Sequence, residues 1–341
     1  YNYANLNTID LDNPPFFIAV IGIMVLWGGL FAVMSGVVNT FRFDGRRVDP
    51  PSWNPGRRLA LVGLALVVLH LLYSALTSPP ALNFETGHHD YALIPQFIRT
   101  GRLAISPRRL VEGTALLMLG PNLMLLALFL PLIARRPRPA MVASAFAVLL
   151  LATGLLRFPL FPLFDSLLES ERYLPAFLLA PFVGNPYPVF PYAAFAFAGA
   201  AFGFSMARSG QPPRLAWAAG VLTAGTGLVG LVVFPTNLYG VDWFWYAKVF
   251  LELGLFVLIT WTVLTVAGAG RPSGHILQRI GRMSLTVYLL QIPLAELLAA
   301  GLSALAPGWN DTVGAAVLFG VANVAIWMGI VALWSRSGYR F

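Results

Sequence analysis

Long apolar stretches alternate with short polar loops along almost the whole chain. Each stretch holds about the twenty residues that an α-helix needs to cross a bilayer. Nine such stretches lie at residues 15–38, 57–77, 110–133, 139–157, 190–207, 214–234, 244–267, 283–305 and 312–334. This pattern predicts an all-α fold, a polytopic transmembrane helical bundle in which residues 1–341 form a single transmembrane domain. One more span before Tyr1 would bring the number to ten.

The composition agrees with this class and excludes soluble ones. Hydrophobic residues make up 58% of the chain and charged residues 11%, and the mean hydropathy is +0.74. The net charge of +8 comes mainly from arginines in short loops beside the apolar stretches. Arginines in that position anchor and orient helices, so we expect membrane lipids and no nucleic acid as partners. The absence of cysteine excludes disulfides and a cysteine-ligated metal site, and no metal is expected.

The arginine content of the loops alternates along the chain. The loops after the first, third, fifth and seventh spans are rich in arginine, which predicts that they are cytoplasmic. We therefore expect residues 39–56 and 268–282 inside, and residues 78–109 and 158–189 outside. The outer loop at 78–109 is an exception because it carries four arginines, Arg99, Arg102, Arg108 and Arg109. They indicate either binding of an anionic headgroup, glycan or phosphate, or simple contact with lipid headgroups.

Two regions depart from a uniform apolar helix. The fifth and sixth spans are rich in glycine and alanine, and Gly199 and Gly203 have the spacing of a GxxxG helix-packing motif. Small residues let helix backbones approach closely, so we expect both spans in the centre of the bundle. The connection at 158–189 is rich in proline and aromatic residues. It predicts a short interfacial helix flanked by re-entrant or surface segments.

Three of the four histidines lie in or just after the second span. His70 is at membrane depth, where an ionisable residue needs a partner and is a functional candidate by default. We expect it to be buried and neutral, either contacting a ligand or bridging two helices through hydrogen bonds. The outer loop carries Glu85, His88, His89 and Asp90. A histidine beside a carboxylate is a candidate general base.

Further charges lie within the seventh and eighth spans. Lys248 and Glu252 are four residues apart on one helical face. They are expected either to neutralise one another as an intrahelical pair or to serve a proton path or substrate pocket. Glu296 has no partner nearby in the sequence and must find one in the folded protein.

Four motifs follow one another in the chain: LFAVMSG at 30–36 before a basic loop and the RRL at 57–59, YPVFPY at 187–192 before a small-residue helix, GRMSLTVYLLQ at 281–291, and Trp334 with GYRF at 338–341. In this order they resemble the bacterial multipass acyltransferase-like family related to heparan-α-glucosaminide N-acetyltransferase. That family's first span, with its histidine signature, has no counterpart here. Its general base would therefore be upstream of Tyr1 or lost.

The resemblance implies a protein of the bacterial inner membrane that transfers an acyl group from cytoplasmic acyl-CoA to an extracytoplasmic glycan or lipid. Acyl transfer needs a base and a group that stabilises the oxyanion. The site residues predicted for this reaction are His88, His89, Asp90 and His70 in catalysis, Arg279 and Arg282 at the CoA phosphates, and Glu85, Arg99, Arg102 and Gln291 at the substrate.

Two other classes of function remain open. The chain is also compatible with a non-catalytic accessory subunit of a larger membrane complex, in which aromatic surfaces meet partner subunits or lipid. Buried Lys248, Glu252 and Glu296 favour a transporter instead.

Overall fold

The computed structural model describes residues 28–45, 55–78, 81–82, 89–103, 106–111, 113–184, 186–234, 241–268, 275–310 and 312–336. The remaining residues include Glu85, His88 and most of the first predicted span. Predictions on those residues lie outside the described part of the chain.

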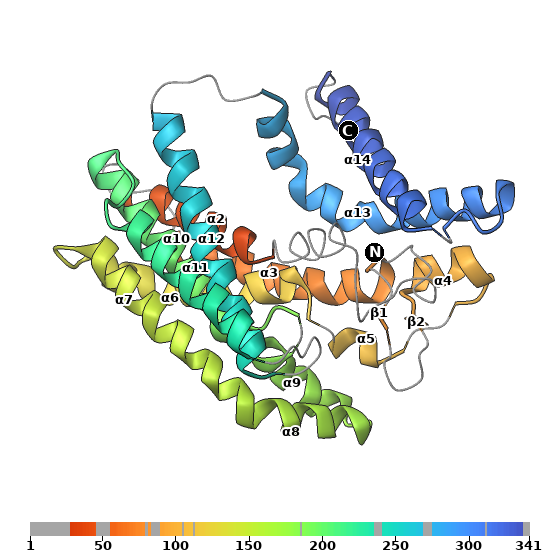
Figure 1. Ribbon diagram of the computed structural model, residues 1–341, viewed down its shortest axis with the longest axis horizontal. Helices are drawn as coiled ribbons and strands as arrows, with labels where there is room; N and C mark the ends of the chain where they lie inside the picture. Colours follow the sequence, from red (N-terminus) through yellow and green to blue (C-terminus); the bar gives the residue numbers. More distant parts are fainter. Residues whose placement is uncertain are drawn as a thin grey trace. The chain divides into compact units, whose positions relative to one another are not determined.

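Apart from one short hairpin, the elements of the structure are helical (Figure 1). They are α2 (Gly28–Gly45), α3 (Pro55–Leu76), β1 (Ala81–Leu82), β2 (His89–Asp90), α4 (Leu93–Thr100), α5 (Arg108–Val111), α6 (Ala115–Ala134), α7 (Pro139–Ala152), η2 (Thr153–Leu156), α8 (Arg157–Glu169), α9 (Tyr173–Val183), α10 (Val189–Ser209), α11 (Ala216–Val233), α12 (Trp243–Gly268), α13 (His275–Leu305) and α14 (Val313–Arg336). Within the described residues, eight helical stretches are long and apolar enough to span a membrane. This confirms the all-α polytopic fold and the positions of all predicted spans except the first.

The proline-rich connection is more helical than predicted. The fourth span continues without a break through α7, η2 and α8, from Pro139 to Glu169, and α9 follows it. Pro159 and Pro162 lie within this continuous helical stretch, and the 3-10 turn η2 comes just before them. The expected re-entrant segments are therefore replaced by two helices.

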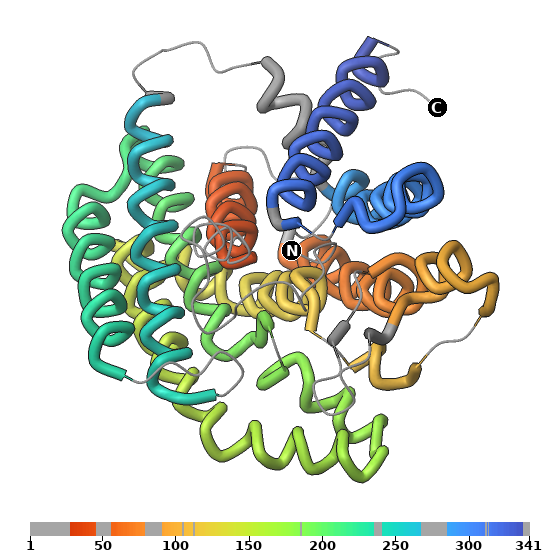
Figure 2. Tube along the Cα trace, turned by 45° about the vertical axis from the view of Figure 1, so that its right-hand side comes forward, coloured from red at the N-terminus to blue at the C-terminus, as the bar shows by residue number. Residues whose placement is uncertain are grey.

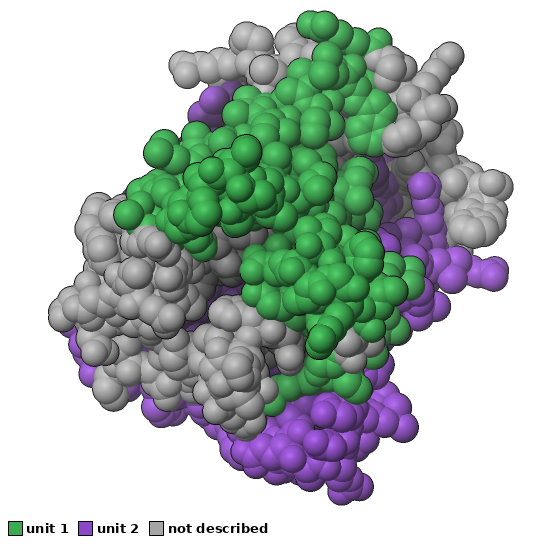
Figure 3. Space-filling model, turned by 90° about the vertical axis from the view of Figure 1, so that its right-hand side faces the viewer, with its two compact units in different colours: residues 1–22, 71–110, 272–341 green, residues 23–70, 111–271 purple. Residues whose placement is uncertain are grey.

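The chain separates into two compact units, which are coloured in Figure 3. Unit 1 contains residues 1–22, 71–110 and 272–341, and unit 2 contains residues 23–70 and 111–271. We describe each unit by itself.

Helix α10 forms the centre of unit 2, as predicted. Most of its residues from Val189 to Phe204 are buried. Its small residues allow a close approach of α2, because a Cβ added at Gly199 would lie 2.0 Å from the Val33 carbonyl oxygen. A Cβ at Gly36 of α2 would likewise lie 2.0 Å from the Ala196 oxygen. The GxxxG pattern is thus used for helix packing.

The prediction that the sixth span also lies in the centre was wrong. Helix α11 packs along α12, and the two run side by side in Figures 1 and 2. Three glycines of α11, Gly220, Gly227 and Gly230, face α12, and a Cβ at Gly227 would lie 2.3 Å from the Leu251 nitrogen. On the other side, bulky residues such as Leu222 and Val232 are exposed. Small residues therefore mark a close contact with one neighbour rather than a central position.

Unit 1 joins the outer loop to the last two helices. Strands β1 and β2 pair antiparallel, with Ala81 opposite Asp90 and Leu82 opposite His89. Helix α13 packs against both α4 and α14. An apolar cluster of Ala295, Ala299 and Phe319 lies between α13 and α14.

Candidate functional site

His70 lies in the C-terminal half of α3 and is completely buried. Its Nδ1 is 2.9 Å from the Thr114 hydroxyl oxygen, and either group donates, depending on the histidine tautomer. Thr114 is the N-cap of α6, where its side chain accepts a hydrogen bond from the Leu117 nitrogen. The predicted burial is confirmed, and the contact orients the ring by linking α3 to α6.

The backbones of α3 and α6 come close because glycines face one another. A Cβ added at Gly63 would lie 2.5 Å from the Gly120 carbonyl oxygen, and one at Gly120 would lie 2.7 Å from the Gly63 oxygen. This contact holds the two helices in the register that brings His70 to Thr114.

The other predicted catalytic residues are only partly described. The backbones of His89 and Asp90 form β2, whereas their side chains, together with His88 and Glu85, lie outside the described residues. Their pairing as base and carboxylate stays a prediction.

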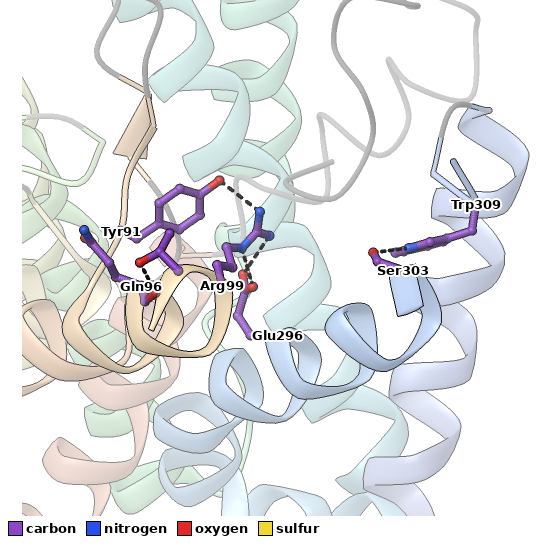
Figure 4. Close-up of polar contacts among 7 residues, drawn as sticks. Tyr91, Gln96, Arg99, Glu296, Ser303 and Trp309 are labelled. Atoms are coloured by element: carbon purple, nitrogen blue, oxygen red, sulfur yellow. Dashed lines mark hydrogen bonds and ion pairs between the residues drawn. The ribbon is translucent and has the colours of Figure 1, made fainter. Parts of the chain in front are cut away.

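Arg99 is the ion-pair partner of Glu296, for which the sequence analysis predicted a partner in the folded protein. Its Nε lies 2.7 Å from Glu296 Oε2, and its Nη2 lies 3.3 Å from Oε1 (Figure 4). The Glu296 side chain is 1% exposed, and that of Arg99 is 35% exposed. The Arg99 Nη1 also donates to the Tyr91 hydroxyl at 3.0 Å. Burial raises the pKa of Tyr91 above its usual value of 10.0, while Arg99 acts in the opposite direction.

Three of the four arginines of the outer loop have clearly different surroundings. Arg99 binds Glu296, and Arg102 is exposed just after α4. Arg109 is buried, and its Nη2 donates to the Ser78 hydroxyl. Arg99 and Arg109 therefore contact protein groups, so the prediction of simple headgroup contact does not describe them.

A second polar cluster lies in unit 2, around Glu252 of α12. The Tyr192 hydroxyl of α10 donates to Glu252 Oε2 at 2.7 Å. The Lys248 Nζ is 3.8 Å from Glu252 Oε1, which confirms the predicted intrahelical pair. From α6, the Asn122 side chain donates to the Tyr192 carbonyl oxygen at 3.4 Å. Sequence reasoning missed Tyr192, because a tyrosine at the start of an apolar helix is no signal by itself.

Sequence reasoning also missed Arg157. The available signal was a single charged residue within a long apolar stretch. It is completely buried at the start of α8. Its Nε and Nη2 donate to the Val183 carbonyl oxygen at 3.0 and 2.7 Å. Its guanidinium carbon lies 3.8 Å from the centre of the Trp245 ring, a cation–π contact with α12. Arg157 thus ties α8 to the end of α9 and to the helix that carries Glu252.

These polar groups of unit 2 share one end of its bundle. Thr114 lies at the start of α6, Tyr192 at the start of α10 and Lys248 near the start of α12. The contact of His70 with Thr114 links α3 to α6, and that of Tyr192 with Glu252 links α10 to α12. The arginine distribution of the loops predicts that this is the extracytoplasmic end.

The predicted acyl-CoA site falls on α13. Arg279 and Arg282 lie on its first turns, but their side chains are outside the described residues. Gln291 is half-buried on the same helix. The Tyr288 ring lies 4.9 Å from that of Tyr73, so Tyr288 packs against α3.

Among the residues that the structure describes, no group of three histidine, cysteine, aspartate or glutamate side chains is placed to hold a metal ion. Comparisons with protein-family models, curated proteins and solved structures give no match to this chain.

Proposed function

We propose that the chain is a membrane-embedded acyltransferase that moves an acyl group from cytoplasmic acyl-CoA to an extracytoplasmic glycan or lipid. The observation that supports this best is His70. A fully buried imidazole at membrane depth, oriented by Thr114, has the surroundings of a functional histidine. The sequence motifs that resemble an acyltransferase-like family add the reaction class.

The reaction defines the role of each group. The acceptor oxygen or nitrogen attacks the thioester carbonyl carbon, the new bond to carbon forms, and the carbon–sulfur bond breaks. A histidine accepts the acceptor's proton and returns it to the leaving CoA sulfur. His70, or His88 or His89 with Asp90 or Glu85, is the proposed base.

The substrate-binding groups follow from the charges. Arg279 and Arg282 are proposed to bind the CoA phosphates, because one guanidinium group can donate two parallel hydrogen bonds to a phosphate group. Arg102 and Gln291 are proposed to contact the acceptor. Arg99 already forms an ion pair with Glu296, so it is proposed to contact the acceptor while it keeps that pair.

Acyl-CoA labelled in its acyl group tests the proposal on membranes that contain the protein. We expect label in the lipid or glycan fraction, together with an equal amount of free CoA thiol. Replacing the base by alanine should lower the rate by roughly 10²–10⁴-fold. His70→Ala, His88→Ala and His89→Ala identify it, and His275→Ala is the matched histidine control with unchanged rate. Failure of the wild-type protein to release thiol or transfer label would contradict the proposal and favour the accessory-subunit class.

A further inference from the structure

Two glutamates lie buried in membrane-spanning helices of the described chain with very different partners. Glu252 and Glu296 are each only 1% exposed. Glu296 receives two bonds from a guanidinium group, the nearer at 2.7 Å. Glu252 has a lysine ammonium only at 3.8 Å, beyond hydrogen-bond distance, and one bond from the neutral Tyr192 hydroxyl.

The two oxygens of Glu252 are therefore unequal. Oε2 accepts the bond from Tyr192, whereas the buried Oε1 has no hydrogen-bond partner among the described residues. Burying a carboxylate oxygen without a hydrogen bond is costly, so Oε1 is the atom of this carboxyl group that is placed to accept a proton. Both oxygens of Glu296, in contrast, accept charge-assisted hydrogen bonds from Arg99.

The charged and titratable groups around Glu252 come from three elements. Lys248 lies on its own helix, Tyr192 on α10, and Arg157 of α8 interacts electrostatically with Tyr192. Tyr187, just before α10, lies with its ring 5.6 Å from that of Tyr192. Helix α11, which packs along α12, contains no titratable residue. Helix α2 also packs against α12, and its carboxylate, Asp44, forms an ion pair with Arg208.

We propose that Glu252 is a proton-binding site, which exchanges between an ion pair with Lys248 and a neutral acid bonded to Tyr192. In the uptake step a proton adds to Oε1, the carboxylate charge is lost, and Lys248 keeps its own proton. The Lys248 side chain is 32% exposed, so the pair is not sealed within the protein. Such a site gives the protein the chemistry of a proton relay or a proton-coupled step. This inference does not depend on acyl transfer.

The test is infrared difference spectroscopy of the purified full chain in lipid nanodiscs, titrated from about pH 4 to pH 10, a range that covers documented buried glutamates. We expect a carbonyl stretching band of a protonated carboxyl group that disappears as the pH rises. Glu252→Gln should abolish this band. Glu296→Gln, the matched change of a carboxylate equally buried but bound to arginine, should leave it in place.

A second variant covers the case in which Glu252→Gln does not fold. Tyr192→Phe removes the hydroxyl that donates to Oε2 and should shift the band frequency without abolishing it. Elution as a single species and an intact helical circular dichroism spectrum are the checks of folding. A band that survives Glu252→Gln, a band that Glu296→Gln removes, or no titrating buried carboxyl at any pH would overturn the proposal.

Discussion

Arg99 of α4 and Glu296 of α13 lie 197 residues apart in the chain, yet they form an ion pair with a 2.7 Å contact inside unit 1. The pair joins the short helix of the outer loop to the middle of a membrane-spanning helix. Tyr91 completes the contact from the end of β2, because its hydroxyl accepts a bond from the same guanidinium group. The outer loop is thereby attached to a specific position along α13.

The unequal burial of the two partners predicts unequal effects of mutation. Arg99→Ala leaves a carboxylate that is 1% exposed without its guanidinium, and breaking a buried pair in this way costs about 3–5 kcal/mol. Glu296→Gln leaves an arginine that is 35% exposed and stays hydrated, so we expect a cost of about 1 kcal/mol or less. Reversible denaturation in detergent measures both free energies of unfolding. Equal costs would show that the pair is less buried than described.

Tyr91 gives a pH-dependent signal in the same cluster. Its pKa is raised by burial, so its phenol stays protonated at pH values where exposed tyrosines ionise. The folded pKa lies above the unfolded one, so the contribution of Tyr91 to stability is complete below about pH 10 and is lost as the pH rises through the folded pKa. Ultraviolet titration of the wild type minus Tyr91→Phe isolates this group.

The same titration has an internal control. Arg99 lowers the pKa of Tyr91 through its charge and its hydrogen bond. Arg99→Ala should therefore move the Tyr91 titration to still higher pH. A shift to lower pH in that variant would contradict the assigned cause.

Close helix packing in unit 2 predicts a strong effect of adding one methyl group. Gly199→Ala forces a Cβ to within 2.0 Å of the Val33 oxygen, so α2 and α10 must separate. We expect a loss of about 1–3 kcal/mol in the free energy of unfolding. Gly225→Ala is the control on α11, where no atom lies within 4 Å of the added Cβ. Its effect should be neutral, or stabilising by up to about 1 kcal/mol through helix propensity.

The contrast between α10 and α11 shows what can and what cannot be predicted from the sequence alone. Hydropathy predicted where the helices lie, because crossing a bilayer requires a fixed apolar length. It did not predict which faces are buried, since lipid and protein interior are equally apolar and both accept a leucine. The same composition of glycine and alanine therefore fits a central helix and a peripheral one.

For the polar sites, too, the sequence predicts local contacts but not contacts between distant segments. The pair of Lys248 and Glu252 was predictable, because a spacing of four residues is local helix geometry. The bonds from Arg99 to Glu296 and from Tyr192 to Glu252 join distant segments, so only tertiary packing brings them together. For His70, the sequence indicated burial, whereas the identity of its partner Thr114 depends on the register of α3 against α6.

The orientation of the protein decides which side of the membrane the polar end of unit 2 faces. The chain contains no cysteine, so single cysteine substitutions can measure this orientation. Exposed Thr100 of α4 lies in the loop predicted outside, and exposed Gln211, between α10 and α11, lies in an arginine-flanked loop predicted inside. An impermeant thiol reagent should label Thr100→Cys in intact cells, and Gln211→Cys only after permeabilisation. The reverse pattern would place His70, Thr114, Tyr192 and Lys248 at the cytoplasmic end. An acceptor that gives its proton to His70 would then have to be cytoplasmic as well.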